Sequence, residues 1–465
     1  MKAHRSLGIV IKLGTSSIVD EKSHEPLLSI LSLVVETAVK LRKDGHKVVI
    51  VSSGAIGIGL RRMDVDKRPK HLSRLQALAA IGQCRLMSLW DSLFNHLQQP
   101  IAQILLTRQD IADRSRYLNA QHTFNELLDM GVIPIVNEND TLAVSEIKFG
   151  DNDTLSAITA AMVHADLLFL MTDVDCLYDK NPRSNPDAKP IEIVDDIGAL
   201  VADVSSAGSA LGTGGMSTKI VAAKLATSAG VTTVITRSSN PGNIFQITSH
   251  VEATRSSHLP STNGTSTPAS DHRPGSPSRP PSTDPAAGRL PLHTRFLPSP
   301  SPVRDRYFWL LHGLKPHGTV YIDGGAHRAL LGKAGLLPAG VVDVEGAFAQ
   351  QEAVRLCVVS RTPAAEGAGE KGGSLWDGPA VEVGRALVNY AATEIARIKG
   401  RQSMEIAALL GYADSEYVAQ REHVSLFQRD SRPVSPAREV ASPTREKTVG
   451  DAKGRDGYGG AGTLL

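Results

Sequence analysis

The residues Gly8-Ile9-Val10-Ile11-Lys12-Leu13 decide the fold class of this chain. They form a short apolar run, suited to a β-strand buried on both faces of a sheet, and a stretch with helical periodicity follows them. The same alternation continues over the first 250 residues. It predicts an α/β fold with a mostly parallel sheet sandwiched by helices. The expected strands are 8–13, 47–51, 101–106, 132–136, 166–171 and 232–236, and the expected helices are 27–42, 72–97, 119–130, 154–163 and 217–229.

The polar residues after each expected strand are candidates for a site, because ligands of such sheets bind outside the carboxyl ends of the strands. Lys12 lies at the end of the first strand and is followed by Gly14 and three hydroxyl residues. The lysine offers positive charge and the glycine lets backbone N–H groups approach, which suits a polyphosphate. A lysine beside an ordinary turn explains the pattern equally well. Ser52-Ser53-Gly54, before the next helix, is a weaker signal of the same kind.

A cluster of acidic and amide residues follows the fourth expected strand. It comprises Asn137-Glu138-Asn139-Asp140 and then Gly150-Asp151-Asn152-Asp153 at the start of a helix. Any one of these residues could serve as a helix N-cap, but the whole set exceeds what capping needs. Such a cluster could bind an amino-acid ammonium group, orient lysines, or meet Mg²⁺ directly or through water.

A glycine-rich segment, 211–219, runs directly into the last expected helix and carries Lys219 one turn inside it. This arrangement is typical of a phosphate-binding loop to which a lysine adds positive charge. It matches neither the Walker A spacing nor the dinucleotide-binding fingerprint. Thr172-Asp173 follows the fifth strand, and no nucleophile–base pair competes with this set. Two lysines, glycine loops and carboxylates are the equipment of phosphoryl transfer.

The composition excludes several other classes of protein. The chain has 465 residues, with 50 Lys and Arg against 48 Asp and Glu and a net charge of +2. Such a small net charge does not indicate binding to nucleic acid or to an anionic membrane. Its three cysteines are far apart and fit neither a disulfide framework nor a zinc pattern. Lys12 interrupts the apolar N-terminus, and no apolar run approaches a membrane span. We therefore expect a soluble cytoplasmic protein.

The domain organisation follows from a sharp change in composition. Residues 251–302 hold eleven of the 26 prolines and ten serines, so we expect a disordered linker or insertion there. Residues 1–250 form the first expected domain. Short strands between Gly/Pro turns predict a small, mainly β barrel-like domain over 303–427, with a low-complexity loop at 362–373. A disordered tail is expected over 428–465.

These motifs together resemble the glutamate 5-kinases (γ-glutamyl kinases) of the amino acid kinase family. The similarity covers essentially all of 1–245, and the second domain resembles the PUA domain that many of these kinases carry. The supporting motifs, in chain order, are VIKLGTSS from Val10, VIVSSGAIGIG from Val49, LLTRQD from Leu105, PIVNENDT from Pro134, KFGDNDTLSA from Lys148, LMTDVDCLY from Leu170, NPRSNP from Asn181 and LGTGGMSTK from Leu211, followed by GTVYIDGGA from Gly318, LLPAG from Leu336 and EIAALLGY from Glu405.

The resemblance implies a reaction and its partners. It implies transfer of the ATP γ-phosphoryl group to the γ-carboxylate of L-glutamate, with Mg²⁺ as cofactor. The product, L-glutamyl 5-phosphate, opens proline biosynthesis. The family's members are commonly inhibited by proline at or near the glutamate site. A homo-oligomer (dimer or tetramer) and coupling with glutamyl phosphate reductase are further expectations.

The resemblance also implies residue roles. Lys12 and Lys219 would contact the transferring phosphoryl group, and Asp153 would orient them. Ser53, Asp140 and Asn152 would hold glutamate. No protein ligand is expected for Mg²⁺, which would be bound through the ATP phosphates. The residues expected to bind ATP are Lys12, Thr172, Asp173, Thr213, Gly214, Gly215, Met216, Ser217, Thr218 and Lys219.

Two other functions remain open from the sequence. Another amino acid kinase, for acetylglutamate or aspartate, would share the fold but should lack this set of motifs. An RNA-binding role through the PUA-like domain is the other alternative. From Val303 to Gln428 there are 13 Lys and Arg against 14 Asp and Glu, a net charge of −1. Because phosphate contacts dominate RNA binding, we do not expect RNA as a partner.

Overall fold

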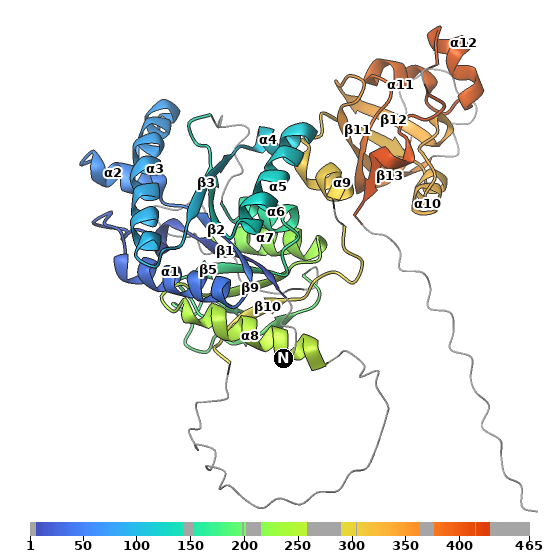
Figure 1. Ribbon diagram of the computed structural model, residues 1–465. Helices are drawn as coiled ribbons and strands as arrows, with labels where there is room; N and C mark the ends of the chain where they lie inside the picture. The colour runs from blue at the N-terminus through green and yellow to red at the C-terminus, as the bar shows by residue number, and fades with distance from the viewer. Residues whose placement is uncertain are drawn as a thin grey trace, which may run out of the picture. The chain divides into compact units, whose positions relative to one another are not determined.

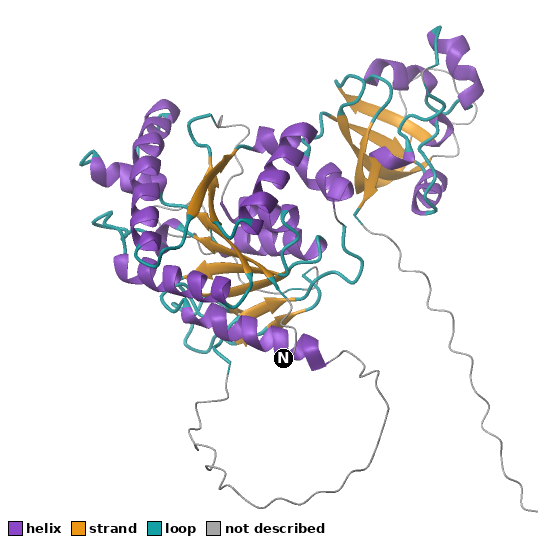
Figure 2. Cartoon of the chain, viewed as in Figure 1, coloured by secondary structure: helices purple, strands orange, loops and turns teal. Residues whose placement is uncertain are grey.

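The computed structural model describes residues 6–142, 152–197, 200, 215–257, 290–303, 305–361, 376–413 and 415–427. Its larger sheet has the strand order β3-β4-β2-β1-β5-β9-β10-β8. Helices flank this sheet (Figures 1 and 2). All neighbouring strands in it are parallel except β9 and β10. The strands are β1 (Gly8–Leu13), β2 (Lys47–Ser52), β3 (Ile101–Leu106), β4 (Ile133–Glu138), β5 (Leu167–Thr172), β8 (Ile193–Val194), β9 (Thr232–Arg237) and β10 (Thr294–Phe296).

Helices cover both faces of this sheet. Side chains alternate between the faces along β1, so Ile9 and Ile11 pack with α1, α3 and α8, while Val10 packs with α5, α6 and α7. The predicted α/β class is therefore confirmed. The helices are α1 (Leu28–Lys43), α2 (Ala55–Arg62), α3 (Leu72–Asn95), α4 (Arg108–Ala112), α5 (Arg114–Asp129), α6 (Asn152–Met162), α7 (Met216–Ser228) and α8 (Gly242–Ser257), with the short turn η1 (Thr15–Ser17) and the strand pair β6 (Leu177–Tyr178) and β7 (Pro190–Ile191) beside them.

The register of the central strands gathers their carboxyl ends at one edge. Leu13 of β1 pairs with Ser52 of β2, and Lys12 pairs with Leu170 of β5. The residues that follow β1, β2 and β5 therefore leave the sheet side by side. This edge is where ligands of parallel sheets bind.

Part of the stretch predicted as a disordered insertion, 251–302, is folded. Helix α8 continues to Ser257, and β10 pairs with β9 and β8 inside the sheet. Phe296 is fully buried there, and Thr294 Oγ1 accepts a hydrogen bond from the Leu177 N–H (2.7 Å). Residues 258–289 lie outside the described part of the chain, and the division into domains stays a prediction.

The second region is a mainly β unit, as predicted. Its sheet has the order β12-β11-β13-β14-β15 around a separate apolar core that includes Val320, Leu356 and Tyr390. The long strand β14 was not predicted, since Gly378 and Pro379 interrupt its apolar pattern. The loop 362–373 and the tail 428–465 lie outside the described residues. The elements are β11 (Gly318–Ile322), α10 (Gly324–Leu331), η3 (Pro338–Gly340), β12 (Val341–Gly346), β13 (Ala353–Arg361), β14 (Trp376–Leu387), α11 (Ala392–Ile398), η5 (Ser403–Glu405), α12 (Ile406–Leu410), η6 (Arg421–His423) and β15 (Val424–Leu426).

A short connection between the two regions packs on the first one. It consists of α9 (Asp305–Phe308) and the π-helical turn η2 (Trp309–Gly313). Phe308, Trp309 and Leu310 belong to the apolar core that contains α5 to α7, and Trp309 Nε1 donates to the Ile111 carbonyl of α4 (2.9 Å). In the described part of the chain, no helix combines the length and the apolar character that crossing a membrane requires.

Candidate active site

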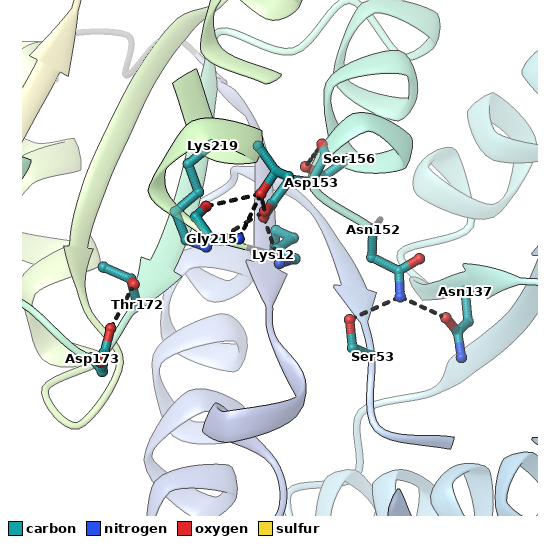
Figure 3. A network of polar contacts seen from close by, with 11 residues as sticks. Lys12, Ser53, Asn137, Asn152, Asp153, Ser156, Thr172, Asp173, Gly215 and Lys219 are labelled. Atoms are coloured by element: carbon teal, nitrogen blue, oxygen red, sulfur yellow. Dashed lines mark hydrogen bonds and ion pairs between the residues drawn. The ribbon is translucent and has the colours of Figure 1, made fainter. Parts of the chain in front are cut away.

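Two lysines from distant parts of the sequence meet at one buried carboxylate. Lys12 Nζ lies 2.5 Å from Asp153 Oδ1, and Lys219 Nζ lies 3.4 Å from Asp153 Oδ2 (Figure 3). Asp153 has no exposed surface, and both lysines are buried as well. The structure thus brings together the three residues expected to carry the reaction.

The three residues come from three different elements of the fold. Lys12 lies near the carboxyl end of β1, Asp153 is in the first turn of α6, and Lys219 is in the first turn of α7. The Thr218 hydroxyl connects α7 to the same carboxylate. It donates a hydrogen bond to Asp153 Oδ2 (2.8 Å) and accepts one from the Gly215 N–H (3.0 Å). The amino end of α7 is therefore fixed to the same carboxylate as the lysines.

The electrostatics of this cluster keep Asp153 ionised. Burial alone would raise its pKa, but the charges of Lys12 and Lys219, with hydrogen bonds from Lys12 and Thr218, outweigh it and lower the pKa to about 2. Among the described contacts, two lysines share this one carboxylate. The amino end of α7 adds the positive end of a helix dipole beside the two lysines, an arrangement that favours an anion.

A second group of polar side chains lies beside Asp153. Asn152 Nδ2 donates to Ser53 Oγ (2.8 Å) and to Asn137 Oδ1 (3.0 Å) (Figure 3). Both of its amide protons are therefore used. Asn152 Oδ1 is buried and has no hydrogen-bond partner within the described ranges. This leaves one buried acceptor available to a donor such as an ammonium group.

The remaining predicted residues are placed as follows. Asp140 lies in the turn after β4, two residues beyond the end of the strand. Gly215 precedes α7, and Met216, Ser217 and Thr218 form its first turn. Thr213 and Gly214 lie outside the described residues.

Polar contacts near the end of β5 involve Arg183 and Arg237, which were not among the predicted site residues. Thr172 Oγ1 donates to Asp173 Oδ1 (3.0 Å), and Arg183 forms an ion pair with the same carboxylate. Arg237 at the end of β9 pairs with Asp175 (2.8 Å). Arg183 belongs to the NPRSNP motif, but nothing local in that motif indicates its partner.

The described residues do not themselves form a metal centre. Among them, no group of three or more His, Cys, Asp or Glu side chains could hold a metal ion. Asp153, the buried carboxylate of the site, is committed to the two lysines and to Thr218.

Comparison with known proteins places this site in a family. The sequence model of the amino acid kinase family matches residues 8–237, and that of the PUA domain matches residues 318–410. A Schizosaccharomyces pombe protein named "Probable glutamate 5-kinase" is 53% identical over 424 residues, which cover 90% of this chain and 94% of the relative. The glutamate 5-kinases of a Cyanothece strain and a Nostoc strain are 45% and 44% identical, covering 99% and 96% of those proteins. With two lysines joined at a buried aspartate in the domain that these relatives share, the chain belongs to the glutamate 5-kinases of the amino acid kinase family and carries a C-terminal PUA domain.

Proposed function

We propose that this protein transfers the γ-phosphoryl group of ATP to the γ-carboxylate of L-glutamate, giving L-glutamyl 5-phosphate, the first intermediate of proline biosynthesis. The observation that carries the proposal is the pair of lysines, Lys12 and Lys219, held at Asp153 beside the amino end of α7. The membership in the glutamate 5-kinases supports the choice of substrate.

The chemistry needs charge neutralisation more than proton transfer. A glutamate side chain has a pKa of about 4.3, so the attacking carboxylate is already ionised at neutral pH and requires no general base. The difficulty is to bring this anion up to a polyphosphate. Lys12 and Lys219 would neutralise and align the transferring group, and Asp153 would hold them in place before the nucleotide binds.

The amino-acid end of glutamate would bind at Ser53, Asp140 and Asn152. The unpartnered Asn152 Oδ1 can accept a hydrogen bond from the substrate ammonium group. The Ser53 hydroxyl accepts from Asn152, which leaves its own proton for a substrate carboxylate. The Asp140 carboxylate would add the negative charge that a cationic ammonium group favours.

The nucleotide would bind at the other side of the lysines. Thr172 and Asp173 at the end of β5, and residues 213–219 leading into α7, are the proposed ATP contacts. Mg²⁺ would be bound through the ATP phosphates, where it neutralises charge.

Further properties are proposed from the family alone. Proline would inhibit by binding at or near the glutamate site, because it carries the same ammonium and carboxylate groups. We also propose a homo-oligomer, coupling with glutamyl phosphate reductase and a cytoplasmic location.

An ATP-dependent hydroxamate assay tests the proposed function. Hydroxylamine traps acyl phosphates, so glutamate, aspartate and N-acetylglutamate can be compared directly, each with and without proline. We expect glutamate to be the preferred substrate and proline to inhibit. A faster reaction with aspartate or N-acetylglutamate would refute the proposal that glutamate is the substrate. If none of the three gave a product, the proposed phosphoryl transfer itself would be refuted.

A further inference from the structure

We infer that Gln83, on α3, is a positioning residue for the amino-acid substrate: through Asn137, it orients the Asn152 amide so that its oxygen faces the substrate ammonium group. The inference rests on the proposed function and extends it to a helix that carries none of the predicted site residues. Gln83 Oε1 accepts a hydrogen bond from Asn137 Nδ2 (2.9 Å), and Asn137 Oδ1 accepts one from Asn152 Nδ2 (3.0 Å).

A backbone group identifies which atom of the Asn137 amide is the oxygen. The Glu138 N–H donates to Asn137 Oδ1 (2.9 Å). A backbone N–H can only donate, so the atom that faces it must be the amide oxygen of Asn137. The Asn137 nitrogen then faces Gln83, where it needs an acceptor, and Gln83 Oε1 supplies it.

The same logic determines which atom Asn152 presents. Asn137 Oδ1 and Ser53 Oγ take both protons of Asn152 Nδ2. Asn152 Oδ1 is therefore a different atom from the one these partners contact, and it is a buried acceptor without a partner in the described ranges. An acceptor in this position selects a donor-only group, and an ammonium group is such a donor.

Helix α3 holds Gln83 firmly. A Cβ atom added at Gly82 would lie 1.7 Å from the Ala55 carbonyl oxygen, so α3 and α2 are in direct backbone contact next to Gln83. Two turns further along, Trp90 Nε1 donates to Ser52 Oγ (3.1 Å) at the end of β2. Gln83 is thus anchored on both sides to the segment that carries Ser53.

The experiment compares Gln83→Leu, which removes the acceptor, with Gln83→Glu, which keeps an acceptor oxygen. Ser88→Leu, at an exposed position of α3, controls for the introduction of a leucine on this helix. For each full-length variant we would measure kcat, KM for glutamate and ATP, the calorimetric Kd of glutamate, and inhibition by glutarate. Glutarate is glutamate without its ammonium group.

For Gln83→Leu we expect KM and Kd of glutamate to rise about tenfold, as for one lost or misdirected hydrogen bond. KM for ATP and the inhibition constant of glutarate should change less than about twofold. Gln83→Glu and Ser88→Leu should stay within about threefold of the wild type for glutamate. A purely structural role would instead weaken glutamate and glutarate alike.

Two results would overturn the inference while leaving the proposed function intact. One is an active wild type with unchanged glutamate affinity in Gln83→Leu. The other is an equal loss of glutamate affinity in Gln83→Leu and Ser88→Leu. A wild-type enzyme that fails to phosphorylate glutamate would instead overturn the proposed function, and the inference with it.

Discussion

The carboxylate of Asp153 lies 2.5 Å from Lys12 Nζ, at a depth in the protein where the aspartate has no exposed surface. A buried charge is costly unless it is paired, so this contact fixes the lysine where β1 ends. The same carboxylate also reaches Lys219. The positive charges that would face a transferring phosphoryl group are therefore in place before any ligand binds, and little reorganisation is required during the reaction.

Lys219→Ala should lower kcat by orders of magnitude, because it removes a charge that acts on the transferring group. KM for glutamate should change much less, since Asn152 and Ser53 are untouched. Lys224→Ala, at an exposed position of the same helix, is the matched control and should behave as the wild type. Steady-state kinetics of hydroxamate formation measure both constants. Near-normal turnover of Lys219→Ala would contradict the role proposed for this lysine.

Asp153→Asn should destabilise the protein as well as lower kcat. Removing one partner of a buried ion pair typically costs about 3–5 kcal/mol, and this carboxylate contacts two buried lysines. Thermal unfolding at pH 7 measures the loss. An unchanged Tm would show that the carboxylate does not hold the lysines.

The low pKa of Asp153 also predicts a pH dependence with a definite sign. Because the folded-state pKa is about 2, below the ordinary value of 3.8, the ionised group stabilises the fold fully above about pH 4. This stabilisation is lost as the pH falls from about 4 towards 2. The Tm of Asp153→Asn should therefore fall less steeply than that of the wild type over this window. If the Tm of the variant and that of the wild type fell equally over this window, the pKa of Asp153 would not be lowered in the folded state.

The fold could be predicted from sequence wherever a local pattern matched the final environment. β1 and β3 have the predicted bounds, because each apolar run pairs with a neighbouring strand and ends before a polar or glycine residue. β1 is almost wholly buried, whereas β3, at the edge of the sheet, is only partly buried. β10 could not be predicted in this way. It has three residues in a proline-rich stretch, and its strand conformation comes from pairing with β9 and β8.

The residues of the site, too, could be predicted only where the local sequence carries a signal. Lys12 and Lys219 stand out because a lysine beside glycine at a strand end or a helix start has a local meaning. Gln83 has no such signal, since an amide in the middle of an amphipathic helix usually faces solvent. Only the contact with Asn137 gives it a role. Such contacts between distant residues are set by tertiary structure and leave no short motif in the sequence.

Gly82→Ala should disturb the contact between α2 and α3. The added Cβ would lie 1.7 Å from the Ala55 carbonyl oxygen, so the two helices must move apart. Overpacking of this kind typically costs about 1–3 kcal/mol. Because α2 begins just after Ser53 and Gly54, we also expect a higher KM for glutamate. Gly242→Ala, where an added Cβ meets nothing within 4 Å, is the matched control. Equal Tm and KM in the two variants would show that the close approach is unimportant.

His312 should make the stability of the protein depend on pH between 5 and 7. The imidazole lies beside the Phe308 and Phe427 rings, with centroids 4.8 and 6.4 Å away. Burial, helped by the charge of Arg385, lowers its pKa from 6.5 to about 3. The folded state thus keeps this histidine neutral where the unfolded chain would protonate it. Its contribution to stability is complete above about pH 6.5 and is lost as the pH falls below that value.

Replacing His312 by Phe tests this directly. Between pH 7 and pH 5 the wild type should lose about 2 kcal/mol more than His312→Phe, since each pH unit below the unfolded pKa corresponds to about 1.4 kcal/mol. Thermal unfolding at both pH values measures the difference. His122→Phe, at an exposed position of α5, controls for the loss of a histidine and should follow the wild type. If His312→Phe loses as much stability on acidification as the wild type, then His312 is protonated in the folded protein, and its burial does not exclude the charged form.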